Sequence, residues 1–290
     1  MNKFFRFAAA GALALSLVAC GSSDDANTNT ETKTDAGTEE STTLTVGATS
    51  SPHAIILEEV KPLMKEAGYD LEIKEFSDYT LIDSATSDGS LDANYFQHSP
   101  YLESYDADSG YASGDDGYLV SVGAIHYEPL GAYSKKYDKI DKDTVEDGAL
   151  VIVPNDATNE ARALYLLQDL GLITLNDDAT ISTATVADIK DNPKNLQIEE
   201  LAAELTPTKL DEADICIVNG NYALDNDIVG DLKASESADS DAAKTYANVI
   251  AVKESNKDNA AVKKLVELLK SDDVKTFITD RFGVSVVPAA

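Results

Sequence analysis

The chain has few of the residues on which common catalytic motifs are built. Its 290 residues include three histidines, two cysteines and no tryptophan. It contains no G-x-S-x-G elbow, H-E-x-x-H helix, Walker A loop or G-x-G-x-x-G turn, and each of these motifs supplies groups that its chemistry requires. The sequence therefore predicts neither an enzyme nor a bound cofactor.

Cysteine occurs only at Cys20 and Cys216, which limits the redox and metal chemistry that is available. Cys216 lies in the apolar stretch ICIV and is predicted to be a small buried core residue. Without a partner for it, no disulfide, thiol-pair redox motif or cysteine–zinc site is expected.

The other cysteine follows a pattern typical of export. Lys3 and Arg6 precede an apolar run that ends at Leu17-Val18-Ala19-Cys20, and this run is too short to span a bilayer. It resembles a bacterial lipobox, in which the cysteine is lipidated. The resemblance implies a signal peptide over 1–19 and a lipid anchor on Cys20.

Positive charge is scarce, with 23 lysines and arginines against 52 aspartates and glutamates and a net charge of −29. Nucleic acids and anionic lipids bind basic patches, so no nucleic-acid partner is expected and membrane contact depends on the lipid anchor. Large apolar residues are absent from 21–43. Residues 20–43 are therefore predicted to be a disordered acidic tether.

The remaining chain alternates between strand and helix patterns. Strands are predicted over 43–49, 70–76, 91–97, 149–154, 196–201, 213–219 and 245–255, and helices over 51–68, 78–90, 99–105, 158–170, 259–270 and 271–282. Ser51 is expected to cap the first helix and Pro62 to kink it. This order predicts the α/β class with a mostly parallel sheet.

Two crossings between lobes are also expected. The apolar run over 118–134 and the return strand from 245 predict lobe 1 over 44–124 plus 248–290, and lobe 2 over 125–247. The two crossover strands would act as a hinge, with a ligand cleft between the lobes.

Arginine is rarer still than lysine. Beyond the signal peptide the only arginines are Arg162 and Arg281. Arg162 is expected in the first turn of its helix, where a cation opposes the helix dipole. A ligand carboxylate in front of the helix would resolve this conflict. The alternative is a salt bridge to Glu160, Asp156 or another acid.

The segment SLDANYFQHSPYL, residues 90–102, gathers aromatic residues and a histidine. Strand alternation places Tyr95 and Gln97 on one face and Phe96 and His98 on the other, at the carboxyl end of the strand. Ligands bind at such ends in open α/β sheets. The alternative is that Phe96 packs in a core and His98 caps the next helix.

Asparagines also lie directly after or inside predicted strands. Asn219 and Asn221 follow the strand DICIV, where they can bind a zwitterion or only form a turn. Asn248 lies inside an otherwise apolar strand and needs hydrogen-bond partners there.

The three histidines leave a metal site as a competing hypothesis. His53, His98 and His126 could bind zinc if they converged, but no two of them have a ligand spacing such as i, i+4. Hydrogen-bonded histidines at the ends of helices or strands are the favoured interpretation, and no metal ligand is assigned.

Several segments together resemble the NlpA family, the methionine-binding lipoproteins of ABC importers. They are FSDYT, LDANYFQHSPYL, YEPLGAYSKK, VPNDATNEARALYLLQDLGLI, DNPKNLQIEEL, IVNGNYAL and YANVIAV, which occur in this order. Membership implies a two-lobed fold like that of periplasmic binding proteins, type II-like, which closes on an amino acid.

The resemblance also implies a set of ligand-binding residues. Tyr79, Phe96 and His98 would surround the thioether of methionine. Arg162 would hold the carboxylate, and Glu128 would lie near the ammonium. The remaining main-chain contacts would come from Asn219 and Asn248.

The implied function is capture of L-methionine and delivery to a cognate permease with its ATPase. The protein would be a monomer, lipid-anchored outside the cytoplasm, on the outer surface of a Gram-positive cell. D-methionine, a methionine-containing dipeptide or another apolar amino acid are alternative ligands, and a zinc receptor is the alternative of a different class.

Overall fold

The computed structural model describes residues 42–237 and 245–289. The described residues belong to one compact unit. The predicted signal peptide, Cys20 and most of the predicted tether lie outside the described residues. Among the residues described, no helix combines the length and the apolar character that crossing a membrane requires.

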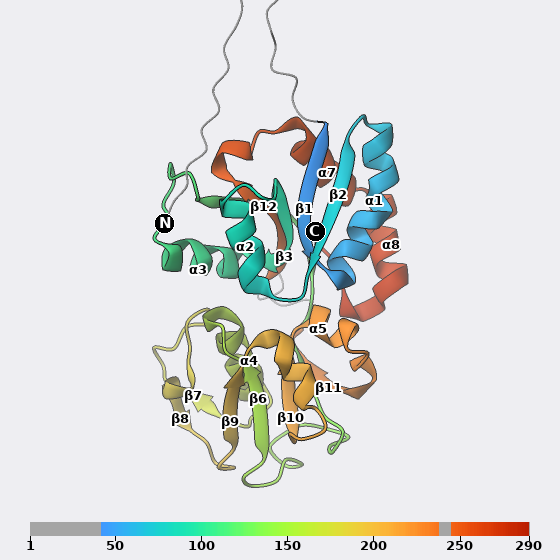
Figure 1. Cartoon of the computed structure of the whole chain (residues 1–290). Coiled ribbons are helices and arrows are strands. Elements are labelled where there is room, and N and C mark those ends of the chain that lie inside the picture. Colours follow the sequence, from blue (N-terminus) through green and yellow to red (C-terminus); the bar gives the residue numbers. More distant parts are fainter. Residues whose placement is uncertain (1–41, 238–244, 290) are drawn as a thin grey trace, which may run out of the picture. The chain divides into compact units, whose positions relative to one another are not determined.

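Lobe 1 is built on a six-stranded sheet in the order β13–β4–β12–β3–β1–β2. The strands are β1 (Thr43–Thr49), β2 (Asp70–Phe76), β3 (Ala93–His98), β4 (Leu119–Tyr127), β12 (Ala247–Lys253) and β13 (Val287–Pro288). Helices α1 (Ile55–Glu66), α7 (Ala260–Leu269) and α8 (Asp272–Phe282) cover one face, and α2 (Tyr79–Ser87) and α3 (Ser99–Ser109) cover the other (Figure 1).

Period-two alternation separates these two faces. In β12, Ile250 and Val252 pack into the core under α1, α7 and α8, whereas Ala251 packs with Leu102 of α3 on the opposite side. Alternate residues of a strand point to opposite faces, so a strand buried on both faces is apolar throughout.

Lobe 2 is built on a five-stranded sheet in the order β11–β5–β10–β6–β9. Its strands are β5 (Gly131–Tyr133), β6 (Leu150–Pro154), β9 (Gln197–Leu201), β10 (Ile215–Val218) and β11 (Leu232–Ser235), with helices α4 (Ala157–Asp169) and α5 (Gly220–Asp225) and a small hairpin of β7 (Thr174–Leu175) and β8 (Ile189–Asp191). Short helical turns complete the chain: η1 (Ser50–Ala54), η2 (Val186–Asp188), η3 (Ala203–Lys209), η4 (Val229–Asp231), η5 (Glu254–Asn256) and η6 (Gly283–Ser285). Cys216 is buried in the core of this lobe with a free thiol, as predicted.

The α/β class and the two lobes are confirmed, but the prediction of a mostly parallel sheet is wrong. β1 pairs in parallel with β2 and β3, whereas β12 is antiparallel to both β3 and β4. The return strand causes this, because β12 re-enters lobe 1 from lobe 2 and inserts between β3 and β4. Since β4 ends at Tyr127 and β5 begins at Gly131, we propose that the first lobe junction lies at 128–130.

The ends of two helices differ from the expectations. α1 begins at Ile55 after a turn without a side-chain cap from Ser51, and it continues through Pro62. α4 begins at Ala157, where the Asp156 side chain accepts a hydrogen bond from the backbone of Asn159 at 3.0 Å. Arg162 therefore lies in the second turn of α4 and not in the first, and its conflict with the helix dipole is weaker than expected.

The alternation predicted for the segment 90–102 fails at Gln97. The pairing of β3 with β12 shifts by one residue between Tyr95 and Gln97, as in a β-bulge at Phe96. Tyr95 packs with the core under α1, but Gln97 donates to Asp83 of α2 and to Asn94. A β-bulge changes which side of the sheet the following residues face, and the hydrophobic pattern of the sequence does not reveal it.

Candidate ligand-binding site

A cavity lies between the two lobes, and small-molecule sites form preferentially at such interfaces between domains. Segments that follow β3, β4, β6 and β10 supply most of its wall, as expected for the carboxyl ends of strands. Its lining residues are Tyr79, Phe96, Gln97, His98, Tyr101, Glu128, Asn159, Arg162, Asn219, Gly220, Asn221 and Asn248. All seven residues predicted for the ligand are among them.

One end of the cavity is aromatic. The ring of Tyr79 lies 5.4 Å from that of Phe96, 5.7 Å from that of Tyr101 and 4.8 Å from that of Tyr222, measured between centroids. The hydroxyl of Tyr79 donates across the lobes to Oδ1 of Asn221 at 2.5 Å. Such a wall favours an apolar and polarisable group. Tyr101 and Tyr222 are not among the residues predicted from the sequence for this site.

His98 both caps a helix and lines the cavity. Its Nδ1 accepts from the backbone N–H of Tyr101 at 3.2 Å, so the proton of the neutral ring lies on Nε2, which donates to Oδ1 of Asn159 at 3.2 Å. Burial, together with the nearby charge of Arg162, lowers the pKa of His98 to about 3. Both ring nitrogens are thus occupied, and the ring can meet a ligand only through its face or its C–H edge.

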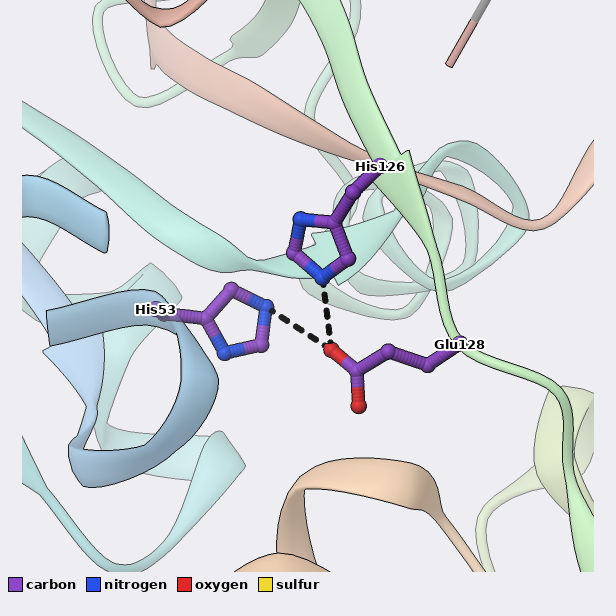
Figure 2. Close-up of side chains that lie close together, drawn as sticks. All are labelled: His53, His126 and Glu128. Carbon is purple, nitrogen blue, oxygen red and sulfur yellow. Dashed lines mark hydrogen bonds and ion pairs between the residues drawn. The ribbon is translucent and has the colours of Figure 1, made fainter. Parts of the chain in front are cut away.

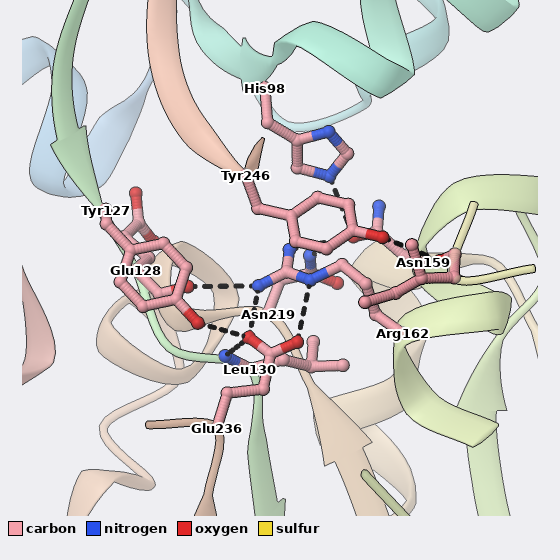
Figure 3. Close-up of polar contacts among 10 residues, drawn as sticks. His98, Tyr127, Glu128, Leu130, Asn159, Arg162, Asn219, Glu236 and Tyr246 are labelled. Carbon is pink, nitrogen blue, oxygen red and sulfur yellow. Dashed lines mark hydrogen bonds and ion pairs between the residues drawn. The ribbon is translucent and has the colours of Figure 1, made fainter. Parts of the chain in front are cut away.

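Arg162 has a carboxylate partner inside the protein (Figure 3). Its Nε donates to Oε1 of Glu236 at 3.0 Å and its Nη2 to Oε2 at 2.6 Å. The ring of Tyr246 covers the guanidinium at 4.4 Å. The salt-bridge alternative is therefore present, but with Glu236 and not with Glu160 or Asp156. The charge and hydrogen bonds of Arg162 outweigh the effect of burial and hold the pKa of Glu236 below its usual value.

The same guanidinium also reaches the cavity. Nη2 donates to the backbone oxygen of Glu128 and Nη1 to Oδ1 of Asn159, both at 3.2 Å. Together with the two bonds to Glu236, these interactions with described residues occupy four of the five N–H groups of Arg162. One N–H of Nη1 is left for a ligand.

Asn159 connects the two lobes. Its Oδ1 accepts from His98 of lobe 1 and, within lobe 2, from Arg162 and from Nδ2 of Asn219 at 3.0 Å. The sequence motif around Arg162 contains Asn159, but an asparagine near a helix start is more often a cap than a link between lobes. Its role was therefore missed.

Unpartnered polar atoms face the cavity. Within the residues that the structure describes, Oδ1 of Asn219 and Nδ2 of Asn221 are buried without a hydrogen-bond partner. Buried polar groups are rarely left unpaired. One acceptor and one donor in a single pocket match a ligand that carries both an ammonium and a carboxylate.

Glu128 is the centre of a second polar cluster (Figure 2). Its Oε1 lies 2.7 Å from Nε2 of His126 and 3.4 Å from Nε2 of His53. His53 also contacts Oδ1 of Asn248 at 3.0 Å. These residues come from separate segments, so no local spacing in the sequence could show that they converge.

Within the described part of the chain, these three side chains have the composition that could hold a metal ion. However, the 2.7 Å separation of His126 and Glu128 is a hydrogen bond, and the ligands of a zinc ion at about 2.0–2.2 Å lie further apart. His98 is bonded elsewhere, to Asn159. The cluster is closed by its own hydrogen bonds, so the zinc alternative gains no support from it.

Comparison with known proteins assigns the family. The model of the NlpA lipoprotein family matches residues 44–290. The chain belongs to the NlpA lipoprotein family. It is 39% identical over 292 residues to the methionine-binding lipoprotein MetQ of Bacillus subtilis, covering 100% of both chains. It is 38% identical to the D-methionine-binding lipoprotein MetQ of Escherichia coli K12, covering 94% of this chain and 93% of that one.

A solved NlpA-like structure extends the comparison. The nutrient-binding protein from Burkholderia cenocepacia, described as bound to methionine, superimposes with a TM-score of 0.78 at 40% identity. The match covers 85% of this chain and 100% of the other. Family and two-lobed fold are thereby confirmed, and membership of a lipoprotein family agrees with the lipobox at Cys20.

Proposed function

We propose that this protein is the substrate-binding lipoprotein of an ABC importer and that it captures L-methionine. The observation that carries the proposal is one cavity with an aromatic end at Phe96 and Tyr79 and a polar end with Arg162 and Glu128. The relatives named for methionine and for D-methionine support the same ligand class.

In the proposed complex the charged groups and the thioether of the ligand each contact side chains of complementary chemistry. The carboxylate would take the remaining N–H of Arg162 and Nδ2 of Asn221, and the ammonium would face Glu128 and Oδ1 of Asn219. Asn248 would complete the main-chain contacts. The thioether side chain would lie among Tyr79, Phe96 and the ring of His98.

The lobes close through side chains that line the cavity. His98 reaches Asn159 across the cleft, and Tyr79 reaches Asn221. A ligand that touches both lobes adds to these contacts and favours the closed state by its differential affinity. Burial of the methionine side chain gains roughly 1.5–3 kcal/mol, and sulfur–aromatic contacts add about 0.3–1.5 kcal/mol, so polar contacts must supply most of the affinity.

The ligand assignment predicts selective thermal stabilisation. L-methionine at 100 times its Kd should stabilise the folded chain by about 2.7 kcal/mol, whereas glycine and aspartate should not. The measurement is a thermal-shift series with L-methionine, D-methionine, glycyl-methionine, leucine and norleucine, combined with mass spectrometry of any co-purifying ligand. Stabilisation only by ligands without an apolar side chain would contradict the assignment.

The aromatic end predicts a selective loss of affinity. Phe96→Ala should weaken methionine by about tenfold or more, because it removes burial and a sulfur–aromatic contact, while alanine should lose little. Isothermal titration calorimetry with both ligands gives the ratio. Leu102→Ala is the matched control, since Leu102 is buried in lobe 1 away from the cavity. Equal losses for both ligands in Phe96→Ala would refute the side-chain role.

The partner and the location follow from the same proposal. A binding lipoprotein of this kind delivers its ligand to a permease with its ATPase, and it acts as a monomer anchored through Cys20. We place it on the outer surface of a Gram-positive cell. A spheroplast fractionation of the wild type beside Cys20→Ala tests the anchor, and release of the variant into the medium is the expected result.

A further inference from the structure

Two histidines lie behind Glu128, outside the cavity wall. His53 and His126 are 1% and 0% exposed and do not line the cavity. The far nitrogen of each ring, Nδ1, meets a hydroxyl: Thr49 at 2.6 Å for His53, and Tyr95 for His126. Each near nitrogen, Nε2, faces Oε1 of Glu128 (Figure 2).

The donors and acceptors around the two rings can be assigned in one consistent way. If the hydroxyl of Tyr95 donates to Nδ1 of His126, the proton of that neutral ring lies on Nε2 and points at Glu128. Thr49 can donate to Nδ1 of His53 in the same way, and the Nε2 proton of His53 then lies between Oδ1 of Asn248 at 3.0 Å and Oε1 of Glu128 at 3.4 Å. Burial lowers the pKa of His126 to about 3 and that of His53 to about 4, so both rings donate hydrogen bonds without adding positive charge.

The opposite side of the carboxylate is also fixed. A Cβ on Gly220 would lie 2.7 Å from Oε2 of Glu128, so only glycine lets the backbone approach this closely. The backbone N–H of Asn221 also favours the ionised form of this carboxylate. Glu128 is thus held between the histidines and the start of α5.

Burial raises the pKa of Glu128, and among the described residues its carboxylate has no dedicated cation. Arg162 faces it only through the backbone oxygen and is paired with Glu236. The titratable or charged groups near Glu128 are His53, His126, Arg162, Asp225 and the tyrosines Tyr79, Tyr95 and Tyr133. Among these described residues Arg162 is the only one that is positively charged at neutral pH, so a buried carboxylate at the cavity wall needs a cation from the ligand.

We propose that His53 and His126, supported by Thr49 and Tyr95, are positioning residues that hold the Glu128 carboxylate toward the ammonium of the ligand. The site would therefore select compounds with a free cationic amine and discriminate against analogues without one. This inference rests on the proposed function, and it adds a determinant of specificity that does not touch the ligand.

The test compares two ligands across a series of variants. The ligands are L-methionine and 4-(methylthio)butanoic acid, which lacks the amine, and calorimetry gives the ratio of their affinities. His126→Leu should lower the ratio by about tenfold or more, because it removes a hydrogen bond to a charged group. His126→Gln keeps an N–H donor and should restore most of the ratio. Tyr95→Phe, nearly isosteric, should lower it less, in the same direction.

A pH series provides a second readout. Glu128 must be ionised to bind an ammonium, and loss of a donor to the ionised form raises its pKa. The affinity of His126→Leu for L-methionine should therefore start to fall at a higher pH than that of the wild type on acidification. A merely structural defect would lower the affinity equally at every pH.

Three outcomes would contradict either the positioning role of the histidines or the proposed function. Equal losses for both ligands in His126→Leu and Tyr95→Phe would overturn the positioning role while leaving the proposed function intact. A wild type that binds neither ligand would overturn the proposed function itself. Tight uptake of zinc chloride by the wild type, abolished in His126→Leu, would assign the cluster to a metal instead.

Discussion

An Arg162→Met chain should bind no measurable methionine and should also lose about 3–5 kcal/mol of stability, the cost of breaking a buried ion pair by removing one partner. The stability loss follows from Glu236, which is 12% exposed and would be left buried without the cation that pairs with it. A role confined to the ligand would predict no loss of stability in the free protein.

The double variant Arg162→Met/Glu236→Gln separates the two roles. Replacing both partners removes the uncompensated charge, so most of the stability should return, while methionine binding should stay absent. Glu236→Gln alone is the matched control, because it keeps Arg162 and the positions of the hydrogen-bonding atoms. Urea unfolding and calorimetry measure the two quantities. Methionine binding by the double variant would refute the carboxylate assignment of Arg162.

Most site residues that the sequence could indicate lie in or directly after strand patterns, as Phe96, His98, Asn219 and Asn248 do. Arg162 is conspicuous because arginine is rare in this chain. The resemblance to the NlpA family added Tyr79 and Glu128. The structure places all seven at one cavity, although their contacts with a ligand stay a proposal.

The residues that were missed act through contacts between distant segments. Glu236 pairs with a residue 74 positions away, and Asn159 reaches His98 over 61 positions. Nothing near Glu236 in the sequence distinguishes it from the other acidic residues of this chain. Ion pairs of this kind depend on tertiary structure, which periodicity does not encode.

The fold was predictable at the level of strand and helix order, and less so in strand direction. Apolar runs and helix signals located the main elements because they reflect local burial. The antiparallel insertion of β12 and the bulge at Phe96 depend on where the chain returns after lobe 2. The bulge also brings Gln97 beside Asp83.

Asp83 is fully buried between α2 and β3, and its ionisation should depend strongly on folding. Its Oδ1 accepts from Asn94 and Gln97, but within the described residues its Oδ2 has no partner, and neither has Oε1 of Gln97. Two acceptors without a donor are explained if Oδ2 carries a proton. Burial raises the pKa of Asp83 to about 8, in agreement with a protonated side chain at neutral pH.

The sign of the pH effect follows from this shift. Between the pKa of the unfolded chain, about 4, and that of the folded chain, about 8, folding takes up a proton. Stability should therefore fall as the pH rises through this window, by about 1.4 kcal/mol per pH unit for this group. Below pH 4 both states are protonated and the contribution is constant.

Asp83→Asn should remove that dependence, because an amide keeps the acceptor Oδ1 and supplies N–H groups in place of Oδ2. The variant should be more stable than the wild type by about 3–5 kcal/mol at pH 7, and by about 1–2 kcal/mol at pH 5. Urea unfolding at the two pH values measures the difference. Asp108→Asn, on the exposed side of α3, removes the same charge from the surface and should show neither effect. A gain that is the same at both pH values would show that Asp83 is ionised in the folded chain.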